Sequence, residues 1–231
     1  MNQITFQSVY NTTTSAQVSP GQVGQTPDGR LWTYVKAGGA IAKNLVAIPN
    51  TVTTVTTVSS STNSQGQIVY ITKASAGWTV GAFAGAYGLV NTGTGTGQGF
   101  KIIGNTTDTL YLAPETALAT ALSVSDSGIA IYRENEVIIA AVTSKIQNAV
   151  GLTQVAFASG EYGWILTKGV GVVVAGEALT IGGSFVTGDD TAGEVVKGTT
   201  AKGEFDEQTL GRCLVANSGA DVGALVFVDI A

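Results

Sequence analysis

The chain has 231 residues, with 31 glycines, 31 threonines, one cysteine and no histidine. Only 12% of the residues are charged, about half of the ~25% usual for soluble domains, and the net charge is −5. The lack of histidine excludes imidazole general bases, Ser–His–Asp or Cys–His nucleophiles and histidine zinc sites. The eleven Lys and Arg residues are scattered singly, so we expect neither a nucleic-acid surface nor a cofactor.

Residues 1–28 are rich in Gln, Asn, Thr, Ser and Gly and contain few apolar residues. This composition predicts an extended N-terminal arm that becomes ordered only on a partner or on a sister subunit. The first ten residues lack the basic start and apolar core of a signal peptide, and no apolar run approaches the ~20 residues of a membrane helix. We therefore expect synthesis in a cytoplasm and no membrane contact.

Beyond residue 28, short apolar or β-branched runs alternate with Gly-containing turns, which is typical of strands. Residues 51–64, TVTTVTTVSSSTNS, predict an edge strand leading into a loop. Residues 91–99, NTGTGTGQG, lack the glycine spacing of a dinucleotide fingerprint and are interpreted as a hairpin loop between strands at 89–90 and 100–103. The other predicted strands are 29–35, 67–73, 109–112, 129–132, 137–142, 164–167, 170–174, 179–181, 194–196, 211–216 and 224–229.

One short helix is predicted at 114–122, because Pro114 suits a first turn and Leu118 and Leu122 lie four residues apart. Residues 137–150 are compatible with either helix or strand. The resulting fold class is all-β: Gly-rich short-strand sandwich or barrel domains, an extended N-terminal arm and at most one or two short helices. The expected organisation is an arm at 1–28, a β-rich domain at 29–148 and a β-domain at 149–231.

Two segments resemble each other within the chain. Residues 29–48 and 162–181 each contain a Trp four positions before a Lys, at Trp32 and Trp164, followed by a Gly-rich apolar run. This similarity indicates either an internal duplication or a coincidence of a chain rich in Gly, Ala and Val.

Carboxylates are the only plentiful reactive side chains, so a glycosidase-like acid pair is the one enzyme class left to consider. Glu134 and Glu136 lie two apart between two predicted strands and would share a strand face if residues 133–136 continued the strand, while 189–190 and 204–207 form acidic loops. Solvated turns explain all of them better, and Cys213 between apolar neighbours is interpreted as a buried strand residue. We therefore predict no catalytic residues, no metal site and no enzymatic activity.

Aromatic residues are the candidates for an interface. Exposed Tyr and Trp can anchor a protein partner or stack on sugars, although alternate residues of a strand can equally pack in the core. The candidates are Trp32, Tyr34, Trp78, Tyr162 and Trp164.

Four stretches resemble the capsid decoration (cement) proteins of tailed bacteriophages. They are DGRLWTYVKAGGAIAKNLVA, AGWTVGAFAGAYGLVNTGTGTGQGFKIIGNTTDTLYL, GEYGWILTKGVGVVVAGEAL and the terminal GALVFVDIA, and the resemblance covers roughly residues 28–231. It implies a β-tulip-like C-terminal domain and a mechanical role: binding to the outside of the expanded phage head and bridging of major capsid protein subunits. It carries over no active site.

The partners implied by the resemblance are the major capsid protein and further copies of the chain, as a trimer or dimer on the virion surface. The low charge agrees with a surface that lies against other proteins. The alternative is a tail-associated or receptor-binding adhesion module that recognises glycans through Trp and Tyr. A carboxylate-based hydrolase is a third, weaker hypothesis.

Overall fold

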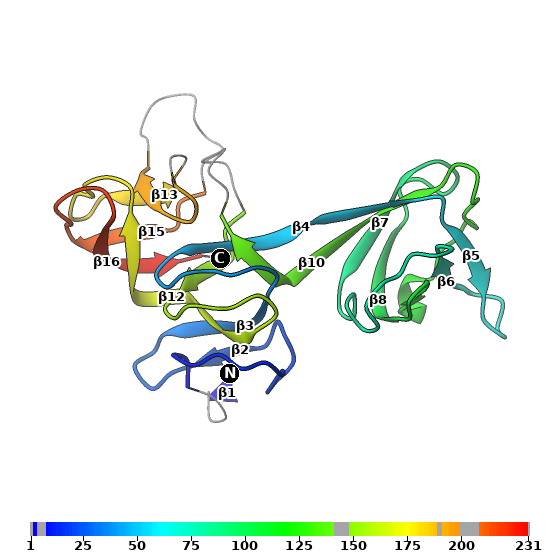
Figure 1. Cartoon of the computed structure of the whole chain (residues 1–231), viewed down its shortest axis with the longest axis horizontal. Helices are drawn as coiled ribbons and strands as arrows, with labels where there is room; N and C mark the ends of the chain where they lie inside the picture. Colours follow the sequence, from blue (N-terminus) through cyan, green and yellow to red (C-terminus); the bar gives the residue numbers. More distant parts are fainter. Residues whose placement is uncertain (1, 4–7, 141–147, 189–190, 199–207, 231) are drawn as a thin grey trace. The chain divides into compact units, whose positions relative to one another are not determined.

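A computed structural model describes residues 2–3, 8–140, 148–188, 191–198 and 208–230 (Figure 1). The fold is all-β, with 48% of the residues in strands and a small five-stranded barrel with many additional strands. This confirms the fold class predicted from the sequence. Among the described residues, no helix is long and apolar enough to span a membrane.

The chain forms two compact units, and one is an insertion within the other. Unit 1 comprises residues 1–49 and 135–231, and unit 2 comprises residues 50–134. Two long strands, β4 (Val46–Thr56) and β10 (Gly128–Ile139), have residues in both units. These divisions differ from the boundaries expected near residues 28 and 148, because strands from both ends of the chain join one sheet in unit 1.

Unit 1 is organised around the 14-residue strand β12. This strand pairs antiparallel with β3, β11 and β16, and β16 pairs in turn with β15. The strands of this unit are β1 (Asn2–Gln3), β2 (Val23–Gln25), β3 (Leu31–Ala37), β11 (Gly151–Thr153), β12 (Tyr162–Ala175), β13 (Ser184–Thr187), β14 (Val195–Lys197), β15 (Gly211–Val215) and β16 (Val222–Asp229).

The two similar sequence segments become neighbouring antiparallel strands. In the β3–β12 pair, Trp32 lies opposite Leu166 and Tyr34 lies opposite Trp164. The same offset of 132 residues separates Trp32 from Trp164 and Tyr34 from Leu166, so a local two-fold axis relates the two pairs. β2 and β11 flank the outer sides of β3 and β12 in the same antiparallel sense. Every antiparallel strand pair has local two-fold axes of this kind, so both interpretations of the similarity, duplication and coincidence, stay open.

Unit 2 is a curved sheet in which β10, β7, β8, β9, β6 and β5 follow one another. Its shorter strands are β5 (Ser59–Thr62), β6 (Ile68–Thr72), β7 (Tyr87–Thr92), β8 (Gly99–Asn105) and β9 (Thr109–Leu112). Its core is mostly aliphatic, with Ile71, Ile102 and Leu110 fully buried, and it includes Phe83 and Phe100. The β7–β8 hairpin encloses the predicted glycine-rich loop, and β5 is the terminal strand of this order, as expected for part of 51–64.

The predicted helix at 114–122 is wrong. Only a 3-10 turn forms, at Pro114–Thr116, and Ala117 then adopts an extended conformation. Distant side chains take the backbone donors of this segment, since the Gln98 Oε1 accepts the N–H groups of both Ala119 and Thr120 at 2.7 and 2.9 Å. Leu118 and Leu122 are nevertheless buried. Their spacing of four residues was therefore a correct sign of burial but not of a helix.

Several predicted strand boundaries also change. The runs at 129–132 and 137–139 belong to the single strand β10, and those at 164–167 and 170–174 belong to β12. Residues 179–181 form no strand. Residues 141–147, which include the rest of the ambiguous segment near 137–150, lie outside the described part of the chain.

The N-terminal segment is folded against unit 1. Its backbone pairs with β12 through reciprocal hydrogen bonds between Thr13 and Tyr162, at 2.9 and 2.8 Å, and with β3 at Tyr34. Val9 joins the core at 6% exposure. The expectation that this arm orders only on a partner therefore does not hold for residues 8–28, because the edge of β3 and the aromatic core provide its partner within the same chain.

The buried hydroxyl of Thr153 ties β11 to the turn before β4. It accepts the N–H of Leu45 at 3.0 Å and donates to the carbonyl oxygen of Ala42 at 2.8 Å. We expect Thr153→Val to lower the free energy of unfolding by about 1–3 kcal/mol, because buried polar groups lose their partner. Urea unfolding followed by circular dichroism measures this, with the exposed Thr180→Val as control; equal losses in both variants would contradict the role of Thr153.

Candidate functional site

The aromatic residues predicted as an interface are mostly core residues. Trp32 and Tyr34 are fully buried and Trp164 is 3% exposed, because they alternate inward on paired strands. The Tyr34 ring contacts the Trp164 ring edge-on, with ring centres 5.1 Å apart. It stacks on the ring of the half-buried Tyr162, with ring centres 6.3 Å apart. Trp78 lies apart from them in unit 2, half-buried against Phe83. The interface prediction is therefore wrong for Trp32, Tyr34 and Trp164, since their side chains are buried in the core and are not available to a partner.

Unit 1 exposes a different apolar surface, on the sheet formed by β12, β16 and β15. Along β16, Ala224, Val226 and Val228 point into the core, while Leu225 and Phe227 at the alternate positions face outward and are apolar as well. Phe227 lies between Val170 of β12 and Arg212 of β15, and Leu225 lies beside Val215. The outer face, as we call it, consists of Val170, Leu214, Val215, Leu225 and Phe227, each 37–53% exposed.

Such a face is unusual for an antiparallel sheet exposed to water. Sheets with one face on a core carry polar side chains on the other face, whereas strands apolar on both faces are covered on both. From the exposed fractions of its five side chains, the outer face presents on the order of 400 Å² of apolar surface, which is the size of the largest apolar patch on many monomers and is often functional. The outer face is therefore the candidate interaction surface of unit 1.

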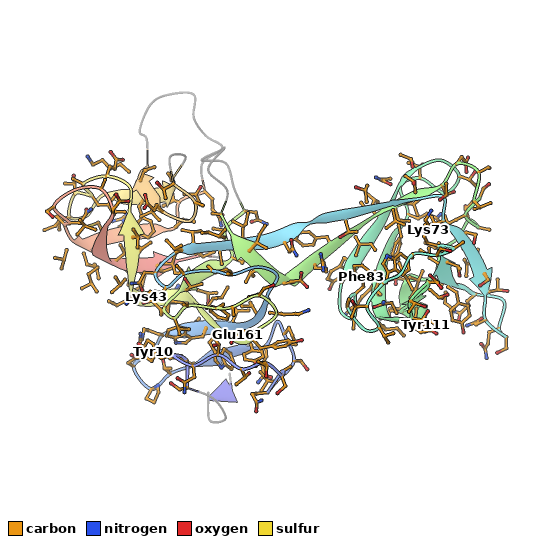
Figure 2. The ribbon with its side chains drawn as sticks, in the orientation of Figure 1. Tyr10, Lys43, Lys73, Phe83, Tyr111 and Glu161 are labelled. Atoms are coloured by element: carbon orange, nitrogen blue, oxygen red, sulfur yellow. The ribbon has the colours of Figure 1, made fainter. Side chains whose placement is uncertain are left out.

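A cleft of about 540 Å³ opens beside the outer face. Val170, Leu225 and Phe227 form part of it, so the cleft and the face are continuous. The N-terminal segment supplies Tyr10, whose side chain is drawn in Figure 2, and the turn before β3 supplies Arg30. The remaining lining residues are Asp28, Gly29, Gln154, Lys168, Gly169, Gly171 and Val172.

The charged groups at the cleft are already paired. The Arg30 Nε donates to Asp28 at 2.7 Å, and its Nη1 donates to the Tyr10 hydroxyl at 2.9 Å. The Lys168 Nζ lies 2.8 Å from the Asp229 carboxylate. The Gln154 amide bonds both backbone groups of Val172, at 2.8 and 3.0 Å.

These contacts shift two pKa values. A hydrogen bond from the Thr26 hydroxyl, at 2.6 Å, lowers the pKa of Asp28, and Arg30 lowers it further. Partial burial acts to lower the pKa of Arg30, but its bonds to Tyr10 and Asp28 outweigh burial and raise it. Both side chains therefore stay charged and bound to each other at neutral pH.

The candidate catalytic carboxylates do not form a described site. Glu136 is 9% exposed and lies 3.7 Å from the Lys36 Nζ across the paired strands. The side chain of Glu134 and the acidic loops at 189–190 and 204–207 lie outside the described residues. Within the described part of the chain, no three His, Cys, Asp or Glu residues form a group that could hold a metal ion.

Cys213 is a buried strand residue, as predicted. It lies on β15 at 2% exposure, and its thiol donates to the carbonyl oxygen of Val215 at 3.4 Å. Burial raises the pKa of the Cys213 thiol, which disfavours the reactive thiolate.

Sequence reasoning missed the outer face, although it predicted the strand at 224–229. The overlooked signal is the unbroken apolar run from Ala224 to Val228, which leaves no polar residue for a solvated side. The cleft had no such signal, because it joins residues near positions 10, 30, 170 and 227.

The lowered pKa of Asp28 gives a pH-dependent prediction. Its contribution to stability is present above its ordinary pKa near 3.8 and is lost as the pH falls through the lowered folded-state pKa. We expect Thr26→Ala to raise the Asp28 pKa toward 3.8 and Thr26→Ser to leave it low, as measured by NMR titration of the carboxyl carbon. An unchanged pKa in Thr26→Ala would show that the hydroxyl is not the main cause.

No family model matches the chain. Neither a curated protein nor a solved structure matches it.

Proposed function

We propose that the chain is a structural virion protein, a decoration protein that binds the outer surface of a phage head and bridges major capsid protein subunits. The observation that carries this proposal is the outer face: an apolar sheet surface continuous with a cleft. The sequence resemblance over residues 28–231 supplies the class of partner. On this proposal the chain acts without catalysis, cofactor, nucleic acid or membrane, at the capsid surface.

The outer face suits a partner that is repeated many times. Burial of apolar surface contributes roughly 25 cal/mol per Å², so a patch of this size provides a modest affinity per contact. Many copies on a closed shell, each with more than one contact, convert modest affinities into stable occupancy. Unit 2 exposes its own apolar side chains, including Tyr87, Leu89 and Ile103, which supply a second surface for bridging.

The same surfaces can serve self-association. Decoration proteins of this kind act at local symmetry axes of the shell, so a trimer or dimer is proposed from the resemblance. Its symmetry would place equivalent outer faces toward equivalent capsid subunits.

Substitutions on the outer face test the proposal. We expect Leu225→Ser combined with Phe227→Ser to weaken binding to expanded shells of the same phage by about 10-fold or more, since loss of buried interface anchors costs about 1–2 kcal/mol each. Co-sedimentation with shells measures occupancy, and circular dichroism verifies folding. Val80→Ser, at a residue 68% exposed on unit 2, is the matched control. Wild-type occupancy by the double variant would contradict the proposal.

A tail-associated or receptor-binding adhesion module is the second candidate function. It is favoured by exposed tyrosines on unit 2: Tyr87 on β7 is 46% exposed and Tyr111 on β9 is 38% exposed. The side chain of Tyr111 is labelled in Figure 2. Tyr70 contacts Tyr111 edge-on at 5.8 Å, and the Lys101 ammonium lies 5.8 Å from the centre of the Tyr87 ring. Exposed aromatic rings stack on sugars as well as on proteins.

A glycan array separates the two functions. On the decoration proposal, the purified chain binds no cell-surface polysaccharide on the array. Binding that is abolished by Tyr87→Ala with Tyr111→Ala, and retained by Val80→Ser, would establish the adhesion function instead. Copy number in purified particles gives an independent measure, because a shell component is present in many more copies than a tail component.

A further inference from the structure

We propose that the cleft beside the outer face receives one bulky, uncharged, apolar side chain from an extended segment of a protein partner. The proposal deepens the proposed function, on which it rests for the identification of that partner as a shell protein. The chemistry of the cleft itself is argued from its lining residues.

The apolar part of the cleft is fixed by sheet pairing. Val170 and Phe227 lie opposite each other on β12 and β16, and Leu225 is the next outward residue on β16. These three side chains are 37–41% exposed, and all three line the cleft. An apolar side chain in the cleft would therefore be covered from more than one side.

The opposite wall is held in place before any partner binds. The Tyr10 ring contacts the buried Trp32 edge-on, with ring centres 6.1 Å apart, and its hydroxyl accepts a hydrogen bond from Arg30. The Arg30 guanidinium lies 5.2 Å from the Trp32 ring and 5.9 Å from the Tyr10 ring. Gly169 permits this approach, since a Cβ there would lie 2.6 Å from the Arg30 Cγ. Binding to such a wall costs little ordering entropy.

Charge decides the kind of side chain. Each cation at the cleft has its own carboxylate, Arg30 with Asp28 and Lys168 with Asp229, and the Gln154 amide is used by the backbone of Val172. An incoming charged side chain would have to compete with these existing ion pairs for a partner. An apolar side chain loses nothing and gains the free energy of its buried area.

Size agrees with a single side chain together with its flanking backbone. The cleft volume of about 540 Å³ lies within the range of about 300–1,000 Å³ that small-ligand sites occupy. Because the cleft opens onto the outer face, a segment anchored in it would continue across Leu225 and Phe227. The cleft would thus fix the position of the partner segment along the sheet, while contact with the outer face would supply most of the buried apolar area.

The test uses the full chain and capped peptides of sequence acetyl-Gly-Gly-X-Gly-Gly-amide, with X as Phe, Leu, Asp or Lys. In NMR titrations at neutral pH, we expect the Phe and Leu peptides to shift and saturate resonances of Tyr10, Val170 and Leu225, and the Asp and Lys peptides to leave them unchanged. Val170→Glu should weaken binding of the Phe peptide by at least about 10-fold, because the substitution introduces an unpaired carboxylate into the cleft. Val80→Glu on unit 2 is the control, and Tyr10→Ala replaces Val170→Glu if that variant does not fold.

Three results would overturn the proposal. They are equal or stronger binding of the charged peptides, no shifts with the Phe peptide at millimolar concentration, and concentration-dependent shifts of the same resonances without peptide, which would assign the cleft to a second copy of the chain. Shell binding is measured separately. If Val170→Glu loses the Phe peptide but keeps wild-type shell occupancy, the assignment of the cleft to the shell contact fails while the proposed function stands; if the wild-type chain binds peptide but no shells, the proposed function fails instead.

Discussion

The pairing of β12 with its neighbours is the constraint on which unit 1 depends. Within the first half of the strand, the segment Gly163–Leu166 is buried, so it is covered by protein on both sides. There it pairs with β3, which brings Trp32, Tyr34 and Trp164 into one core cluster. Strands of this kind read as continuous apolar runs, and the chain continues that pattern into the second half of β12 and into β16. In the second half, however, only one face is covered.

The outer face is the consequence of that uncovered half. Phe227, for example, is a large apolar residue of the kind found in cores, but its side chain is exposed. Of the charged groups nearby, Lys168 and Asp229 pair with each other, and the exposed Arg212 lies opposite Phe227. The low charge of the whole chain agrees with a surface that carries few charged side chains where contact is proposed. A shell protein as partner joins these features in one account.

Sequence reasoning predicted the elements whose partners are local. The all-β class and the β7–β8 hairpin follow from alternation and from turn residues, which act within a few positions. The helix at 114–122 failed because Gln98, a distant residue, takes the backbone donors of Ala119 and Thr120. The aromatic interface failed for Trp32 for a similar reason: a Trp on a strand has the same sequence pattern whether it faces a core or a partner. The cleft was beyond prediction, since it exists only after the N-terminal segment folds onto the sheet.

The most direct test of the account is the solvent accessibility of the outer face on and off the shell. Hydroxyl-radical footprinting of the full chain, free and bound to expanded shells, reports the labelling of individual side chains. The account predicts that Leu225 and Phe227 are labelled in the free chain and protected on the shell, while the buried Trp32 stays unlabelled in both. Equal labelling of Leu225 and Phe227 in the free and shell-bound chain would contradict it.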